Sequence, residues 1–132
     1  MRAAEYVVPR AAGDSDDGEC TVITFGPGKG GSIDENIDRW VGQMSAQRAA
    51  PTRTTRVSHG MNVTRVETAG TYTGMRMPGA PPSPPKSGWR LVGAIVEAPS
   101  GFWFIKLTGP NATVQAAAAE LDAMVDSAHP RP

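Results

Sequence analysis

The chain has 132 residues and a formal net charge of zero at pH 7, with 13 Lys and Arg residues and 13 Asp and Glu residues. This balance argues against a protein that binds nucleic acid through its phosphates and against a polybasic protein of membrane surfaces, because both need an excess of positive charge. Hydrophobic residues make up 39% of the chain, which is too many for a disordered protein, and the length predicts one domain with one core.

The first elements in chain order are two predicted strands, at residues 2–8 and 19–25, which we expect to pair antiparallel. The connection between them, 11–18, is rich in turn residues and ends in Asp17-Gly18, a hairpin signal. Its acidic residues have neither the glycine position nor the final glutamate of an EF-hand calcium loop, so we interpret them as a solvated turn.

The next segment, 26–31, is rich in glycine and fits the G-x-G-x-x-G pattern of dinucleotide-binding loops. We interpret it as a connection between strand and helix, because Asp34 and Glu35 would repel a pyrophosphate at the start of that helix. The parallel βαβ units that a dinucleotide fold needs do not follow either. A weak anion contact through Lys29 is the alternative, and we expect no cofactor.

A helix is predicted over residues 32–48. Ser32 and Glu35 form a capping box, in which the serine hydroxyl accepts a hydrogen bond from the backbone N–H three residues on. The apolar residues that recur at helical spacing, and so predict a face that packs on a sheet, are Ile33, Ile37, Trp40, Val41 and Met44.

After this helix, a hairpin is predicted from strands at 52–57 and 61–67, followed by a separate strand at 70–75. The segment 77–87 holds five prolines, which exclude regular structure. An irregular stretch of this length is typical of a functional loop or of one that drapes over the domain.

Two further strands, at 89–97 and 102–107, carry apolar residues on both faces, as strands do at the centre of a sheet that is covered on both sides. A last helix is predicted at 112–127, before a frayed tail at 129–132. The order of elements predicts one α+β domain over 1–128, with a largely antiparallel sheet of about six to seven strands and two helices.

Cysteine and histidine are too few to assemble a reactive site. Cys20 is the only cysteine, and His59 and His129 fall in a turn and in the tail. We therefore expect no disulfide, no metal site and no catalytic set, and we expect Cys20 to be buried on its strand. No apolar run reaches the roughly 18–20 residues that span a bilayer, so we expect no direct membrane insertion.

The candidate binding residues begin with the flank of the first helix. Asn36, Arg39 and Gln43 lie along that flank, where they either line a groove or hydrogen-bond to a loop that covers the helix. Lys106, on a central strand, either finds a structural acceptor or serves as a ligand-binding cation. Tyr72 is an aromatic residue of the core or of a groove.

The Pro-rich loop supplies the remaining candidates, Met77, Pro81 and Pro82. Prolines are already ordered before binding, and methionine side chains adapt to varied surfaces. We interpret the loop as an interaction surface or as a lid over the core.

Two functions fit these residues. The first is a non-enzymatic binding or scaffold module that presents the Pro-rich loop and the helix flank to a protein or cell-envelope partner. The alternative is a small-ligand carrier or a weak enzyme, with a pocket between the sheet and the first helix lined by Arg39, Tyr72 and Lys106. A pocket of about 300 Å³ or more with convergent polar groups would favour the alternative.

Several strings of the sequence carry a resemblance. Gly30-Gly31-Ser32 is followed by Asn36 and Arg39-Trp40, and the strand at 102–107 runs into Lys-Leu-Thr-Gly-Pro at 106–110. In these features the chain resembles a family of uncharacterised bacterial proteins that are often exported or lipid-anchored. The order of elements is similar to the PsbP-like fold, an antiparallel sheet with helices on its faces. The resemblance implies a non-catalytic binding or scaffold module of the cell envelope and brings no established activity.

The same resemblance bears on the compartment. Members of the family carry further sequence, including an export signal, before the strand that here occupies residues 2–8. We expect a periplasmic or envelope location if such a signal precedes this chain, and a cytoplasmic location otherwise.

Overall fold

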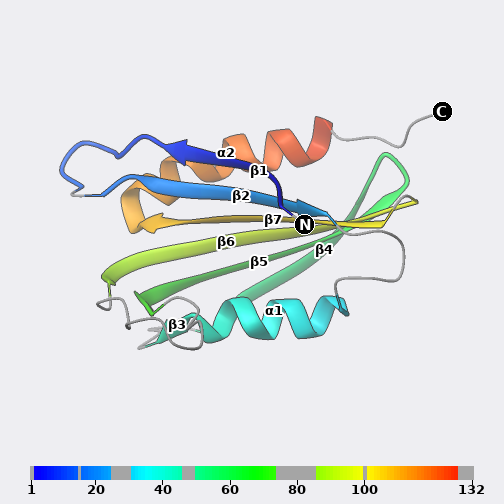
Figure 1. Cartoon of the computed structure of the whole chain (residues 1–132), viewed down its shortest axis with the longest axis horizontal. Helices are drawn as coiled ribbons and strands as arrows, with labels where there is room; N and C mark the ends of the chain where they lie inside the picture. The colour runs from blue at the N-terminus through cyan, green and yellow to red at the C-terminus, as the bar shows by residue number, and fades with distance from the viewer. Residues whose placement is uncertain are drawn as a thin grey trace.

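The protein folds as an antiparallel sheet with one helix on each face (Figure 1). The computed structural model describes residues 2–14, 16–24, 31–45, 50–73, 86–99 and 101–127, with side chains from residue 4 onward. Within these ranges there are seven strands and two helices, so the predicted α+β class is confirmed.

Neighbouring strands in the sheet are ordered β1-β2-β7-β6-β5, and β3 and β4 both pair with the far side of β5. Every pairing is antiparallel, so the predicted hairpins are confirmed. The elements are β1 (Arg2–Val8), β2 (Gly18–Thr24), α1 (Ile33–Gly42), β3 (Met44–Ser45), β4 (Thr52–Ser58), β5 (Met61–Tyr72), β6 (Lys86–Ala98), β7 (Gly101–Pro110) and α2 (Asn111–Ser127).

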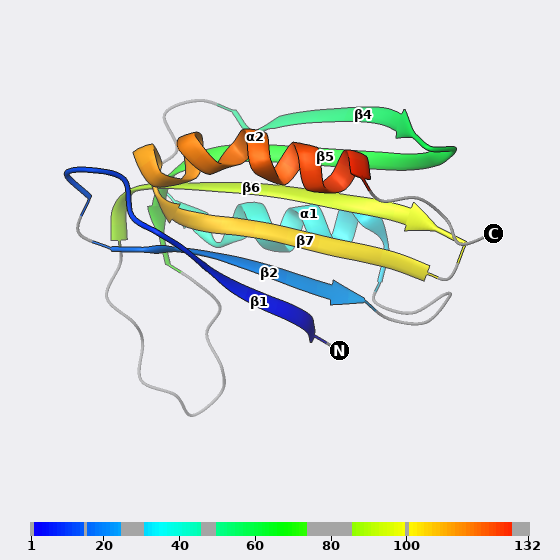
Figure 2. The same ribbon diagram turned by 90° about the horizontal axis from the view of Figure 1, so that it is seen from above.

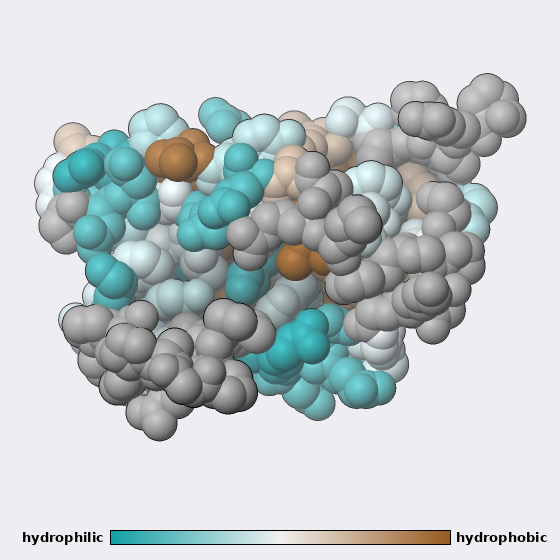
Figure 3. All heavy atoms as spheres, viewed as in Figure 1, coloured by the Kyte–Doolittle hydropathy of each residue, from teal (hydrophilic) through white to brown (hydrophobic). Residues whose placement is uncertain are grey.

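The first helix differs from its prediction at one end only. It begins as expected, because Ser32 Oγ accepts a hydrogen bond of 3.1 Å from the backbone N–H of Glu35. It ends at Gly42 and not at residue 48, since glycine is a poor helix former and the next residue, Gln43, caps the helix. Met44 is still buried, but from the short strand β3, which pairs with the end of β5. Where Figure 3 leaves the outer surface over α1 visible, that surface is hydrophilic.

The long strand β5 corrects a second expectation. The strands predicted at 61–67 and 70–75 are one strand that continues to Tyr72. Gly70 does not break it; the pairing with β6 becomes irregular just after that glycine, where the missing side chain tolerates a bulge. Likewise β6 begins at Lys86, three residues earlier than predicted.

Two cores lie on the two faces of the sheet, one under each helix. Side chains of β6 alternate between them: Val92, Ala94 and Val96 face α2, whereas Leu91 and Ile95 face α1. All five are at most 3% exposed, so β6 is covered on both sides, as its sequence predicts. Cys20, as expected, is buried in the core under α2.

Helix α2 lies over β6 and β7 on one face of the sheet (Figure 2), and this placement positions the candidate site. It follows β7 without a loop, since the strand ends at Pro110 and the helix begins at Asn111. At its last turns, Asp122 pairs with Arg65 of β5 and Asp126 pairs with Arg56 of β4. The quarter of the sheet formed by the start of β4, the end of β5 and the start of β6 therefore lies beside the helix and not beneath it.

Candidate functional site

On the flank of α1, the predicted binding residues Asn36 and Arg39 are joined by a hydrogen bond. Asn36 is 2% exposed, and its Nδ2 donates a hydrogen bond of 2.8 Å to the carbonyl oxygen of Ser32. Its Oδ1 accepts a hydrogen bond from Arg39, whose side chain lies on the exposed surface of the helix. Asn36 thus fixes the first turns of the helix and orients Arg39.

Gln43 and Lys106 are brought together by the fold. Gln43 is 2% exposed, and its Oε1 accepts a hydrogen bond of 3.0 Å from Nζ of Lys106, on the central strand β7. Its backbone carbonyl accepts from both the N–H and the hydroxyl of Thr73, at 2.8 and 3.0 Å. The lysine has therefore found a structural acceptor, the first of the two roles that its sequence position allows.

Tyr72 packs at the same end of this face. Its ring stacks on Trp89 of β6, with centroids 5.2 Å apart and planes 15° apart. Burial, with the charge of Glu19, raises the pKa of the Tyr72 hydroxyl above its usual value. Nζ of Lys86 lies over the Trp89 ring, 5.5 Å from its centroid, which is within the distance of a cation–π contact.

The space between α1 and the sheet is occupied by Trp40. Its ring meets Phe104 edge to face, with centroids 6.5 Å apart, and covers the backbone of Gly93. The alternative prediction places a ligand pocket at this interface, where the structure has tryptophan packing instead. The remaining candidates, Met77, Pro81 and Pro82, lie outside the described residues.

A hollow lies on the opposite face, in the quarter of the sheet beside α2. It has a volume of about 670 Å³ and is lined by β4, β5, β6 and the first residue of α2. We call it the α2-side groove and define it by Thr52, Glu67, Ala69, Thr71, Arg90 and Asn111. The sequence reasoning did not indicate a hollow on this face, because no local pattern reveals where α2 packs on the sheet.

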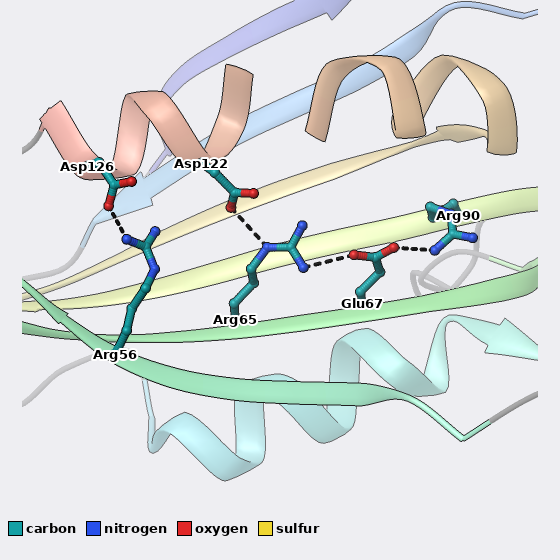
Figure 4. Close-up of polar contacts among 6 residues, drawn as sticks. All are labelled: Arg56, Arg65, Glu67, Arg90, Asp122 and Asp126. Atoms are coloured by element: carbon teal, nitrogen blue, oxygen red, sulfur yellow. Dashed lines mark hydrogen bonds and ion pairs between the residues drawn. The ribbon is translucent and has the colours of Figure 1, made fainter. Parts of the chain in front are cut away.

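A chain of ion pairs runs from this groove to α2 (Figure 4). Nε of Arg90 donates a hydrogen bond of 2.7 Å to Oδ1 of Asn111, and its Nη1 donates to Oε2 of Glu67. The other carboxylate oxygen of Glu67 accepts from Nη1 of Arg65 at 2.8 Å, and Nε of Arg65 donates to Asp122 at 2.9 Å.

The charges in this chain are partly buried, with side chains of Arg65, Glu67 and Arg90 between 18% and 27% exposed. Burial by itself disfavours a charged guanidinium, but the hydrogen bonds to Glu67 and Asp122 outweigh it and raise the pKa of Arg65. Hydrogen bonds between ionised groups in such surroundings are stronger than those at an exposed surface. The arrangement holds Arg90 in a fixed orientation at the wall of the groove.

Sequence reasoning missed these residues although a signal was present. Arg90 faces the same side of β6 as Val92, and Glu67 and Arg65 face the same side of β5 as Val63. A charged residue on the inward face of a buried strand must find a partner, and this marks it for a structural network or a site.

Among the described residues, no group of His, Cys, Asp and Glu side chains is arranged to hold a metal ion. None of the described helices is long and apolar enough to cross a membrane.

Comparisons with known proteins show the fold alone. No protein-family model and no curated protein matches the chain. A solved structure of similar fold is that of a candidate regulator of unknown function from Pseudomonas aeruginosa, with a TM-score of 0.63 and 10% sequence identity. The similarity covers 98% of this chain and 83% of that one, so the whole domain shares its arrangement with that protein.

Proposed function

We propose that the protein is a non-enzymatic binding module that takes a small polar ligand in the α2-side groove. The observation that carries this proposal is the fixed guanidinium of Arg90 at the wall of a groove of about 670 Å³. Pockets for small molecules measure roughly 300–1,000 Å³ and contain a few well-placed polar groups. A side chain that is already held in place loses little entropy on binding, and this favours affinity.

This proposal keeps the class of function that the sequence indicates and moves the site. The narrower hypothesis, a cell-envelope partner bound by the Pro-rich loop and the α1 flank, stays a prediction. Arg39 is the exposed and oriented residue of that flank that supports it.

The proposal is tested by blocking the groove without disturbing the core. Thr52 and Thr54 are both exposed on the edge strand β4 and point to the same side, but only Thr52 lines the groove. Thr52→Trp should fill the groove, and Thr54→Trp is its matched control, since tryptophan is well tolerated in strands. A library of neutral, anionic and cationic polar metabolites is screened by thermal shift against the wild type and both variants.

We expect at least one compound to raise the Tm of the wild type and of Thr54→Trp but not of Thr52→Trp. A ligand present at 100 times its Kd adds about 2.7 kcal/mol to the free energy of unfolding, which such a screen detects. If every compound shifts all three proteins equally, or shifts none of them, the groove is not a binding site and the proposal is wrong.

A further inference from the structure

The chemistry of a ligand for the α2-side groove follows from the N–H donors of Arg90 that are not used in its hydrogen bonds to Asn111 and Glu67. A guanidinium carries five N–H donors. Arg90 uses Nε for Asn111 and one Nη1 donor for Glu67, and within the described part of the chain its Nη2 has no hydrogen-bond partner. The side chain is 18% exposed and lines the groove, so a ligand there can contact the guanidinium. A guanidinium held at two points and open at a third is suited to an anionic oxygen acceptor.

The carboxylate of Glu67 limits which anion can bind. Glu67 also lines the groove and is 27% exposed, so a ligand that reaches Arg90 also approaches a negative charge. A phosphate dianion would be repelled by this carboxylate more strongly than a monoanion. Each oxygen of Glu67 already accepts one hydrogen bond, and a carboxylate has about four acceptor positions in all. A donor group on the ligand can therefore bond to Glu67 while an acceptor group bonds to Arg90.

Small residues leave room beside this pair. The wall next to Arg90 is formed by Ala69, Thr71 and Gly88, and a Cβ added to Gly88 would meet no atom within 4 Å. The hydroxyls of Thr52 and Thr71 supply further polar groups along the groove. The space accommodates a compact ligand with a short side chain.

We infer that the α2-side groove recognises a small carboxylate that carries a hydrogen-bond donor next to its carboxylate, as amino and hydroxy acids do. This inference rests on the proposed function. The carboxylate of the ligand accepts from Nη2 of Arg90, and its amino or hydroxyl group donates to Glu67. Arg90 and Glu67 together thus select a ligand that carries both a carboxylate and a neighbouring hydrogen-bond donor.

The test is an NMR titration of the ¹⁵N-labelled protein, followed at the side-chain N–H signals of Arg90, with five probes. Lactate and alanine carry both groups, propionate lacks the donor, alaninol lacks the carboxylate, and inorganic phosphate is the dianion. We expect lactate and alanine to bind at least tenfold more tightly than propionate. Alaninol and phosphate should give no saturable shift over the same concentration range.

Variants check that the selectivity comes from the Arg90–Glu67 pair. Arg90→Lys should weaken lactate binding at least tenfold, whereas Arg56→Lys, at an arginine on the same side of the sheet outside the groove, should leave it unchanged. Glu67→Gln keeps the shape and removes the charge, so it should admit phosphate and narrow the difference between lactate and propionate. Either groove variant suffices if the other does not fold.

The outcomes separate this inference from the proposal on which it rests. If phosphate or alaninol binds as tightly as lactate, or propionate equals lactate, the inference is overturned while the groove remains a binding site. The inference is also overturned, and the groove remains a binding site, if Thr52→Trp blocks the binding of library compounds but none of the five probes binds. If neither the library nor the probes give a shift that Thr52→Trp removes, the proposed function itself is wrong.

Discussion

At the scale of single residues, the contact between Trp40 and Gly93 determines how closely α1 approaches the sheet. A Cβ placed on Gly93 would lie 2.4 Å from Cζ3 and 2.6 Å from Cε3 of the Trp40 ring, much closer than carbon atoms can approach. The ring is 5% exposed and held by Phe104, so it has little freedom to move away. The glycine is therefore required by packing.

We predict that Gly93→Ala lowers the free energy of unfolding by about 1–3 kcal/mol, the usual cost of overpacking a core. Urea denaturation measures the change, provided that the free energy of unfolding falls with urea concentration at the same slope in both proteins. Gly42→Ala is the matched control, because a Cβ at that helix position meets nothing within 4 Å and alanine favours helix. The prediction is contradicted if Gly93→Ala is as stable as the wild type or as the control.

At the scale of elements, the last turns of α2 are joined to the β4–β5 hairpin by polar contacts. Arg56 pairs with Asp126, and Nε2 of His59, in the turn of the hairpin, lies 2.8 Å from the backbone carbonyl of Asp126. The hydrogen bond from Arg56 is the main cause that lowers the pKa of Asp126 below its usual value of 3.8. Together with the Arg65–Asp122 pair, these contacts tie the C-terminal half of α2 to β4 and β5.

We predict that Asp126→Asn lowers the Tm at neutral pH and that this difference disappears in acid. A carboxyl group whose pKa is lowered by folding stabilises the protein fully above its unfolded-state pKa, and this contribution is lost as the pH falls through the lower, folded-state value. Thermal melts of both proteins from pH 7 to below pH 3.8 measure the difference. Glu120→Gln, at an exposed position of the same helix, is the control. A Tm difference that persists undiminished at the acid end would contradict the assignment.

At the scale of the whole molecule, the sheet joins two cores that do not touch each other directly. One core packs under α1 and the other under α2, and the strands β6 and β7 contribute to both. Domains of this size usually unfold in a single cooperative transition. Damage to one core should therefore destabilise the other by the same amount.

Leu121→Ala tests this coupling from the α2 side. Leu121 is 4% exposed in the α2 core, and truncating a buried leucine to alanine costs about 2–5 kcal/mol. We expect tryptophan fluorescence, to which Trp40 and Trp89 of the α1 core contribute, to shift together with far-ultraviolet circular dichroism. Two separate transitions would show instead that the cores unfold independently.

Features that depend on neighbours along the chain could be predicted from the residues alone. Apolar residues on both faces identified the buried central strands, and the serine cap located the start of α1. The apolar faces of the helices and the hairpin signals were enough to predict an α+β fold with an antiparallel sheet covered on both faces. The end of α1 and the continuity of β5 escaped prediction, because residues after Gly42 pair with the end of β5 and β5 itself pairs with β6 past Gly70.

The position of the groove depends on contacts between residues that are distant in the sequence. Glu67 and Arg90 are 23 residues apart and meet because β5 and β6 pair in one particular register. The groove lies beside α2 because the helix packs over β6 and β7 and not over the start of β4 and the end of β5. Register and helix placement are set by the packing of whole elements, and no local pattern of residues specifies them.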